Sequence, residues 1–153
     1  MSEYDDFDLA ILREMQRDAR QTTDVVGDNV GLSATAVQRR LKRLRARGAI
    51  SREVAIVDPA IVGGRVTMLV GIVLQRGGAH VVDNFRRSVG PVAEIQQCYY
   101  TTGDFDFMLV VSALDMADYE AFTRRIFFEN SDIQRFHTIV SIDTVKAGLE
   151  IPI

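Results

Sequence analysis

Apolar residues recur at helical spacing three times in the first fifty positions of the chain. The pattern predicts an amphipathic helix over 6–19, a short helix over about 23–30, and a third helix over 33–47 that Gly48 ends. Ser33 is expected to cap the third helix, because a serine hydroxyl accepts a hydrogen bond from an unpaired amide of the first turn. Gly31 can take a positive φ and so turn the chain steeply before that helix. Helices joined in this way predict a helix-turn-helix unit.

The periodicity changes in the second half of the chain, where β-branched and apolar runs alternate with helical ones. Strands are expected over 49–57, Val66–Gln75, Val92–Thr102, Phe105–Ala113 and Ile139–Val145, and helices over Ala79–Val89 and Met116–Phe128. From position 66 onward the order β-α-β-β-α-β is ferredoxin-like, so we expect an α+β fold with two helices on one face of a sheet. The other face is apolar too, which predicts dimerisation.

The dipeptides Asp58-Pro59 and Gly63-Gly64 interrupt the pattern between the two halves. We expect a helix-turn-helix domain over 1–56, a linker over 57–64 and a ferredoxin-like domain over 65–153. The strand at 49–57 would serve as the wing of a winged helix-turn-helix, and it would bring Arg52 near a DNA backbone.

The side of the third helix that faces away from Val37 is polar and basic. It carries Thr35, Gln38, Arg39, Lys42, Arg43 and Ala46. Amide, hydroxyl and guanidinium groups suit the base edges and phosphates of a major groove. Residues 33–47 hold six basic and no acidic side chains, although the whole chain has a net charge of −3. An ordinary solvated helix face is the alternative, but the short helix and glycine turn before this one favour binding of double-stranded DNA.

Composition argues against several other classes of protein. The longest nearly apolar run, Val66–Leu74, is too short to span a bilayer, and the acidic N-terminus is unlike a signal peptide, so we expect a cytoplasmic protein. The single cysteine, Cys98, and two distant histidines, His80 and His137, predict neither a disulfide nor a metal site. No cluster of nucleophile, base and carboxylate is recognisable, so neither an enzyme nor a cofactor is expected.

Several of these segments together resemble the leucine-responsive regulatory protein/AsnC (Lrp/AsnC) family, the feast/famine regulators, over the whole chain. The carrying segments are Asp5-x-x-Asp8-x-x-Ile11-Leu12, Val30-Gly31-Leu32-Ser33-x-x-x-Val37-x-Arg39-Arg40-Leu41-x-Arg43-Leu44, Gly48-x-Ile50, Cys98-x-x-x-Thr102-Gly103-Asp104-Phe105-Asp106-Phe107, and Val145-Lys146 with Pro152. A helix-turn-helix match alone is weak, but with the Gly-Asp-Phe-Asp hairpin at this distance it is specific.

The resemblance implies a helix-turn-helix joined to a RAM-type ferredoxin-like domain, with homodimers that assemble further, often into octamers. It also implies a small-molecule effector, commonly an amino acid, bound between dimers near the turn at Gly103 and Asp104. The effector residues it implies are Tyr100, Thr101, Gly103, Asp104, Asp106 and Thr138. The alternative for this segment is an ordinary turn, with Asp106 only capping or pairing.

The expected function is therefore that of a sequence-specific transcriptional regulator modulated by a small molecule. The expected DNA-contacting residues are Ser33, Thr35, Gln38, Arg39, Lys42, Arg43, Arg45 and Arg52. An architectural, DNA-compacting protein without an effector is the alternative. It would bind with little sequence preference and would lose affinity steeply with salt.

Overall fold

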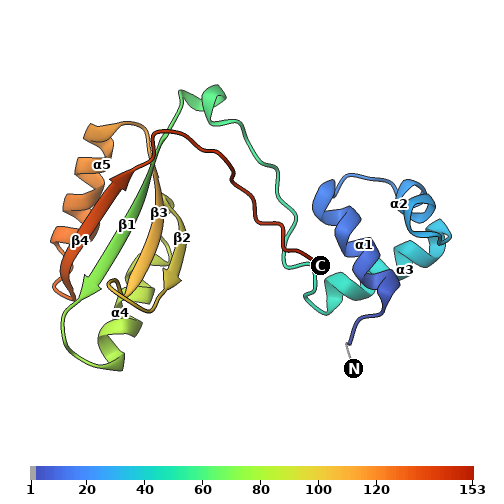
Figure 1. The fold of residues 1–153 in the computed structure, drawn as a ribbon, viewed down its shortest axis with the longest axis horizontal. Coiled ribbons are helices and arrows are strands. Elements are labelled where there is room, and N and C mark those ends of the chain that lie inside the picture. Colours follow the sequence, from blue (N-terminus) through green and yellow to red (C-terminus); the bar gives the residue numbers. More distant parts are fainter. Residues whose placement is uncertain (1–2) are drawn as a thin grey trace. The chain divides into compact units, whose positions relative to one another are not determined.

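The computed structural model describes residues 3–153, which fall into two compact units (Figure 1). The helical unit contains the chain up to Ile56 together with Ala147–Ile153, and the sheet unit contains Val57–Lys146. The C-terminal segment was expected to belong with the sheet, but it groups with the helices instead. Its hydrogen bonds explain this grouping, because Arg13 and Gln16 of the first helix bind its backbone.

The helical unit consists of α1 (Asp6–Arg17), α2 (Thr23–Val30) and α3 (Ala34–Ala46). Each begins at a side-chain cap, provided by Asp5, Thr22 and Ser33 respectively. The first helix stops two residues before the expected end, since Asp18 is already extended, at φ −154°. One apolar side of each helix packs into a common core, formed by Ile11, Met15, Val26, Val37, Leu41 and Leu44.

The turn between α2 and α3 requires glycine at two positions. Gly31 has φ 72°, in the left-handed region that side chains with a Cβ disfavour. Gly27 lies against the turn itself, and a methyl group there would sit 2.5 Å from the carbonyl oxygen of Leu32. The Leu32 amide also donates to the Gly27 carbonyl at 2.9 Å. The backbone of the turn therefore occupies the space that a side chain at position 27 would need.

The strand expected at 49–57, and with it the wing, does not form. Residues 51–58 have no regular secondary structure, and their side chains are exposed. A β-strand needs a neighbouring strand to pair its backbone groups, and no strand of the described chain pairs with this segment. A short 3₁₀ helix, η1 (Pro59–Val62), follows.

The sheet unit has the expected order of elements. These are β1 (Val66–Leu74), α4 (Ala79–Val89), β2 (Ile95–Tyr100), β3 (Phe107–Ala113), α5 (Met116–Thr123), a π-helical turn η2 (Arg124–Phe128) and β4 (Ile133–Val140). The strands lie in the order β2-β3-β1-β4, and each pairs antiparallel with its neighbours. This is the ferredoxin-like βαββαβ arrangement, so the predicted α+β fold class is confirmed.

The last strand lies earlier than the sequence pattern indicated. It was expected over 139–145, but β4 pairs with β1 from Leu74 opposite Ile133 to Met68 opposite Val140. Alternation explains the true position, because Phe136 and Thr138 face the helices while Arg135 and His137 face the other side. Because Asp132 and Arg135 are charged, residues 132–138 were expected to form a connection before the last strand. The helix expected to run to Phe128 is likewise α-helical only as far as Thr123.

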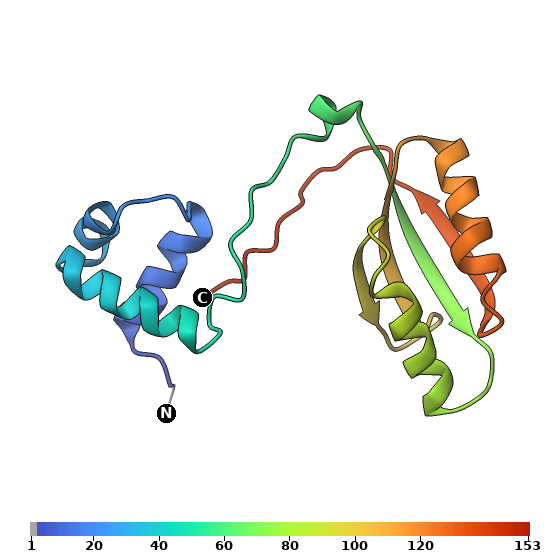
Figure 2. The same ribbon diagram turned by 180° about the vertical axis from the view of Figure 1, so that it is seen from behind.

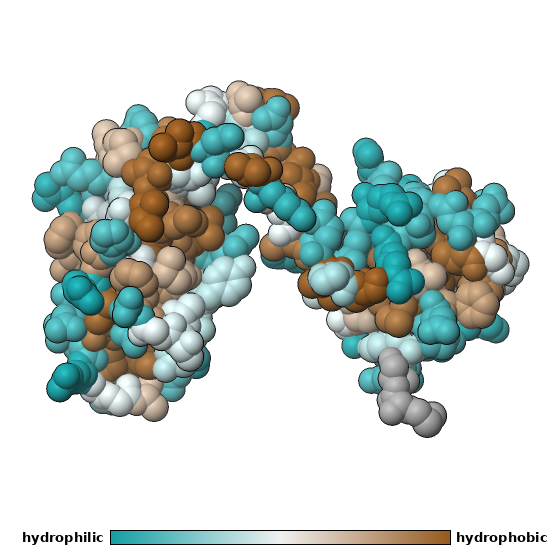
Figure 3. Space-filling view, in the orientation of Figure 1, coloured by the Kyte–Doolittle hydropathy of each residue, from teal (hydrophilic) through white to brown (hydrophobic). Residues whose placement is uncertain are grey.

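The two helices cover one face of the sheet, as Figure 2 shows, and leave the other open toward the viewer in Figure 1. The core between helices and sheet is apolar throughout, and its fully buried members include Met68, Val70, Ile72, Phe85, Phe107, Leu109 and Val111. Apolar side chains also gather on the open face (Figure 3). Leu69 there is 40% exposed and Ile139 is 50% exposed. In residues 3–153 no helix is both long enough and apolar enough to span a lipid bilayer.

Candidate functional site

The exposed side of α3 presents polar side chains that have no competing partner. Val37, Leu41 and Leu44 bury the opposite side of the helix. Thr35, Gln38, Arg39 and Lys42 all point to solvent. Within residues 3–153, no side-chain hydrogen bond or ion pair involves Gln38, Arg39 or Lys42. These three side chains are therefore free to bind a ligand surface laid against the helix.

Ser33 has a local structural role at the start of this helix. Its hydroxyl oxygen accepts a hydrogen bond from the Ala36 amide at 3.3 Å, as expected for a helix cap. The cap fixes the N-terminus of α3, where unpaired amides and the positive end of the helix dipole favour an anion such as a phosphate.

The remaining basic residues differ in how free they are. Arg43 binds the carboxylate of Asp8, and Arg45 forms an ion pair with Glu53 at 2.7 Å. Arg52 is exposed in the irregular segment after α3, without a side-chain hydrogen bond or ion pair in the described part of the chain. The expected DNA-contacting residues thus include two arginines that are partly neutralised by neighbouring carboxylates.

An ion-pair network that joins α1 to α3 was not predicted from the sequence. Asp8 is only 1% exposed, and its Oδ1 accepts from Arg40 Nη1 at 2.7 Å. Its Oδ2 accepts from Arg43. Arg40 also binds both oxygens of Asp5 at 2.8 Å, and this hydrogen bonding holds the pKa of Asp5 below its ordinary value. The network fixes the angle at which the basic side of α3 is presented.

The hairpin between β2 and β3 contains five of the six predicted effector residues. Gly103 has φ 105°, so the turn needs a glycine there. Thr101 closes the hairpin, donating from its hydroxyl to the Phe105 carbonyl at 2.7 Å and from its amide to Asp106 at 2.9 Å. Asp104 is exposed and has no side-chain partner in residues 3–153. It is the available carboxylate of this turn.

The other predicted effector residues have internal contacts. Tyr100 packs on Phe107, and the Arg86 guanidinium lies 5.0 Å from its ring. Asp106 accepts a hydrogen bond from the Leu74 amide at 2.8 Å, which anchors the hairpin to the end of β1. Thr138 lies on β4, beyond β1 from the hairpin, and its hydroxyl is 2.6 Å from that of Tyr119. The single chain therefore does not bring Thr138 to the turn.

An aromatic contact beside the turn was also missed. Gly71 of β1 lies beneath the ring of Phe105, since a methyl group there would be 2.6 Å from Phe105 Cδ1. The same ring stacks on His137 of β4, with centroids 6.3 Å apart. A glycine inside an apolar strand was the available signal, because it often marks the close approach of another group. Phe105 and His137 therefore flank the turn on the open face of the sheet.

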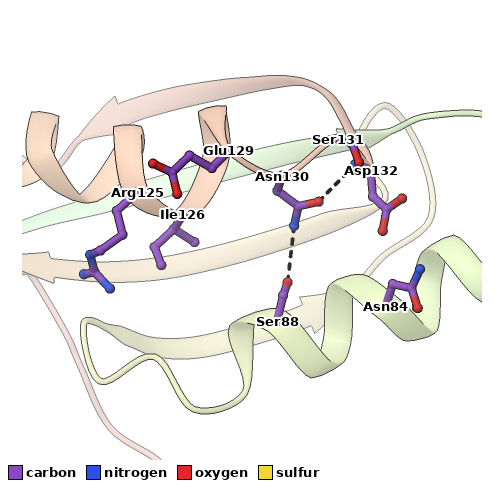
Figure 4. Close-up of a pocket in the computed structure, with 8 residues that line it drawn as sticks. All are labelled: Asn84, Ser88, Arg125, Ile126, Glu129, Asn130, Ser131 and Asp132. Carbon is purple, nitrogen blue, oxygen red and sulfur yellow. Dashed lines mark hydrogen bonds between the residues drawn. The ribbon is translucent and has the colours of Figure 1, made fainter.

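A pocket of about 400 Å³ in the sheet unit lies elsewhere, between α4 and the turn before β4. Figure 4 shows Asn130 at its centre, donating to Ser88 of α4 at 3.3 Å and accepting from the Asp132 amide at 3.0 Å. The bond to Ser88 holds the turn onto α4, and the bond from Asp132 lies within the turn. None of the predicted effector residues lines this pocket.

Cysteine and the metal-binding residue types add no further site. Cys98 lies on β2 as expected, and burial raises the pKa of its thiol above the ordinary value. Within residues 3–153, no three His, Cys, Asp or Glu side chains are grouped so that they could hold a metal ion.

Both halves of the chain match known domain families. The AsnC-type helix-turn-helix domain matches residues 5–45, and the Lrp/AsnC ligand binding domain matches residues 67–151. The chain belongs to the Lrp/AsnC family. It is accordingly a DNA-binding transcriptional regulator with a ligand-binding domain, and the resemblance found in the sequence is confirmed.

Individual relatives agree with this assignment over nearly the whole chain. An HTH-type transcriptional regulator, y4tD, of Sinorhizobium fredii is 50% identical over 151 residues, covering 99% of this chain and 89% of that protein. An AsnC family transcriptional regulator from Agrobacterium tumefaciens superposes with a TM-score of 0.90 at 30% identity, covering 97% of each chain. A feast or famine regulatory protein from M. tuberculosis, complexed with L-methionine, has a TM-score of 0.86 at 25% identity, covering 96% of this chain and 97% of that one.

Proposed function

We propose that this regulator recognises specific DNA sequences by placing α3 in the major groove. One observation carries the proposal: the exposed side of a capped helix presents Gln38, Arg39 and Lys42 without internal partners. Gln reads adenine and Arg reads guanine through paired hydrogen bonds, and Lys suits phosphate. We assign base contacts to Gln38 and Arg39 and a phosphate contact to Lys42.

The other predicted contacts would serve to position the helix. Thr35 and the α3 N-terminus, which Ser33 caps, suit a phosphate at the edge of the groove. Arg43 and Arg45 of α3, and Arg52 in the segment after it, would add positive charge near the DNA backbone. Because Arg43 and Arg45 already bind carboxylates, we expect each to contribute less to affinity than Lys42.

Selection from a random duplex library, followed by a salt titration, tests this proposal against the architectural alternative. A sequence-specific regulator enriches a defined site and binds it about 10³-fold or more tightly than random DNA. An architectural protein enriches no site, and its affinity falls equally with salt on every duplex. Failure to enrich a site would contradict the proposal.

We also propose that a small molecule, of the amino-acid class, binds at the β2–β3 hairpin. The unpaired carboxylate of Asp104 suits an ammonium group, and the backbone around Gly103 offers polar groups for a carboxylate. Thr101, whose hydroxyl and amide are already bonded within the hairpin, would hold the turn in shape. The M. tuberculosis relative complexed with L-methionine supports this ligand class. Tyr100 would border the site. Asp106 would stabilise it indirectly, by anchoring the hairpin to the end of β1. Thr138 would join the site only from another copy of the chain.

A thermal-shift screen of the twenty amino acids tests the effector site. A ligand that binds only the folded state adds about 2.7 kcal/mol to the free energy of unfolding at a concentration of a hundred times Kd, and so raises the melting temperature. Asp104→Ala should abolish the shift, whereas Asp143→Ala, at another exposed aspartate of the sheet unit, should retain it. No shift with any amino acid, or an unchanged shift in Asp104→Ala, would contradict the assignment.

The open face of the sheet supports a proposal on assembly. A homodimer that pairs these faces would bury Leu69, Tyr99 and Ile139, and dimers would assemble further, up to an octamer. Leu69→Arg should then lower the mass measured by light scattering to that of one chain. Because its ligand is chromosomal DNA, we place the protein in the cytoplasm, and we propose no catalytic activity for it.

A further inference from the structure

The last residues of the chain bind one face of α1 through their backbone. Ile151 donates its amide to Gln16 Oε1 at 2.8 Å and accepts from Gln16 Nε2 at 3.0 Å through its carbonyl. One helical turn earlier, Arg13 donates from its Nε to the Ile153 carbonyl. The three bonds join segments 135 to 140 positions apart in the sequence.

This contact fits an extended peptide segment. The amide and carbonyl of an extended residue point to the same side of the chain, so one Gln carboxamide can bind both. Pro152 favours that geometry, because a residue before proline is biased toward the extended region. Arg13 and Gln16 are three positions apart and so share one face of α1.

The bonds of residues 147–153 to α1 add a second connection between the chain after β4 and the helical unit. The chain leaves the sheet at Val140, passes through an exposed stretch, and becomes part of the helical unit from Ala147. Two stretches of chain therefore run between the helical unit and the strands of the sheet, 57–65 before β1 and 141–146 after β4. Without the bonds to Gln16 and Arg13, only the first of these connections would remain.

From these contacts we infer that residues 147–153 form a latch that docks on the Arg13–Gln16 face of α1 in the same chain. The occupant of this face is the chain's own tail, and the recognised feature is an extended backbone ahead of a proline. Through the latch, a displacement of β4 would be transmitted to α1 by the C-terminal segment, in addition to any transmission through the segment before β1. That use in signalling rests on the proposed function, whereas the latch itself does not.

Site-resolved hydrogen exchange on the full-length protein tests the latch without DNA or effector. We expect the Ile151 amide to exchange at least about tenfold more slowly than the Glu150 amide, after correction for intrinsic rates, because only the former is bonded. Gln16→Met, nearly isosteric but without amide groups, should remove the difference. Arg17→Met, at the next position of α1, should leave it. Equal exchange of the two amides in the unmodified protein would overturn the latch.

Cross-linking decides whether the tail binds its own chain. In a Cys98→Ser background, Arg17→Cys and Glu150→Cys in one chain, which leave the bonds from Gln16 and Arg13 intact, should react with a short bismaleimide to give a looped single chain. Mixed single variants, each carrying one of the two cysteines, should give no cross-linked dimer above background. A dimer from the mixture in place of the loop would overturn docking within one chain. Because neither readout involves DNA, failure here is distinguishable from failure of the proposed function.

Discussion

Removal of the buried Asp8 carboxylate is expected to loosen α3 from α1. Asp8→Ala deletes two charge-assisted hydrogen bonds to arginine, each worth about 1.5–3 kcal/mol. Loss of one partner of a fully buried ion pair costs about 3–5 kcal/mol. Here the cost is smaller, because Arg40 keeps Asp5 and Arg43, at 45% exposure, can turn to water. We therefore expect a loss of about 2–3 kcal/mol.

Hydrogen exchange measured against urea concentration reports this loss for each unit separately, since it resolves peptides from α3 and from the sheet. Asp6→Ala is the matched control, because Asp6 shares the first turn of α1 but is exposed and has no side-chain partner in residues 3–153. Only the helix-dipole contribution, about 0.3–1 kcal/mol, should be lost there. A cycle with Arg43→Ala should show a coupling above about 0.5 kcal/mol. Equal losses in Asp8→Ala and Asp6→Ala would refute the network's role.

Three further changes follow from buried contacts. Gly27→Ala should destabilise the helical unit by about 1–3 kcal/mol in the same exchange assay, despite the better helix propensity of alanine, because its methyl group would meet the Leu32 carbonyl; a stabilised variant would contradict this packing. Gly71→Ala should displace the Phe105 ring, detected as a changed His137 chemical shift. Gly64→Ala, which strains the backbone at φ 75° before β1 but meets no neighbouring group, should not change that signal. Burial raises the pKa of Tyr119, so its contribution to stability is complete below about pH 10 and is lost as pH rises through the folded-state pKa; urea midpoints should fall more steeply above pH 10 in the unmodified protein than in Tyr119→Phe.

Local signals in the sequence were sufficient to place a helix where a residue that begins or ends it coincides with helical periodicity. The helix expected over about 23–30 has those bounds, because its apolar spacing marked the helix and Gly31 ends it in a left-handed conformation; the Thr22 cap was not predicted. The start of α3 follows from capping by Ser33. The element order of the ferredoxin-like unit was also predictable, since apolar runs separated by glycine and proline mark its strands and helices.

Elements that depend on pairing were predictable only in part. The last strand was expected over 139–145 and lies over 133–140, because Arg135 and His137 alternate with inward residues on a face that a single chain leaves open. The segment over 51–58 has strand-forming residues but no partner strand in the described chain, so propensity alone predicted a strand that does not form.

Contacts between distant residues of the site could not be predicted from local pattern. The arginines that bind Asp8 lie 32 and 35 positions away, so neither capping rules nor helical periodicity indicates them. The contact of Phe105 with Gly71 and His137 likewise depends on the register of three strands. The family resemblance, not local pattern, implied that Thr138 joins the hairpin in a site between dimers; within one chain β1 lies between them.

The central claim, that the exposed side of α3 reads DNA sequence, is tested most directly by the affinities of single variants for a selected site and for random duplex. Arg39→Ala and Gln38→Ala should each reduce the discrimination between the two by about 1–3 kcal/mol, whereas Lys42→Ala should weaken binding to both by a similar factor and lower the salt slope by about one. Unchanged discrimination in both Arg39→Ala and Gln38→Ala would contradict the assignment of α3 as the reading helix.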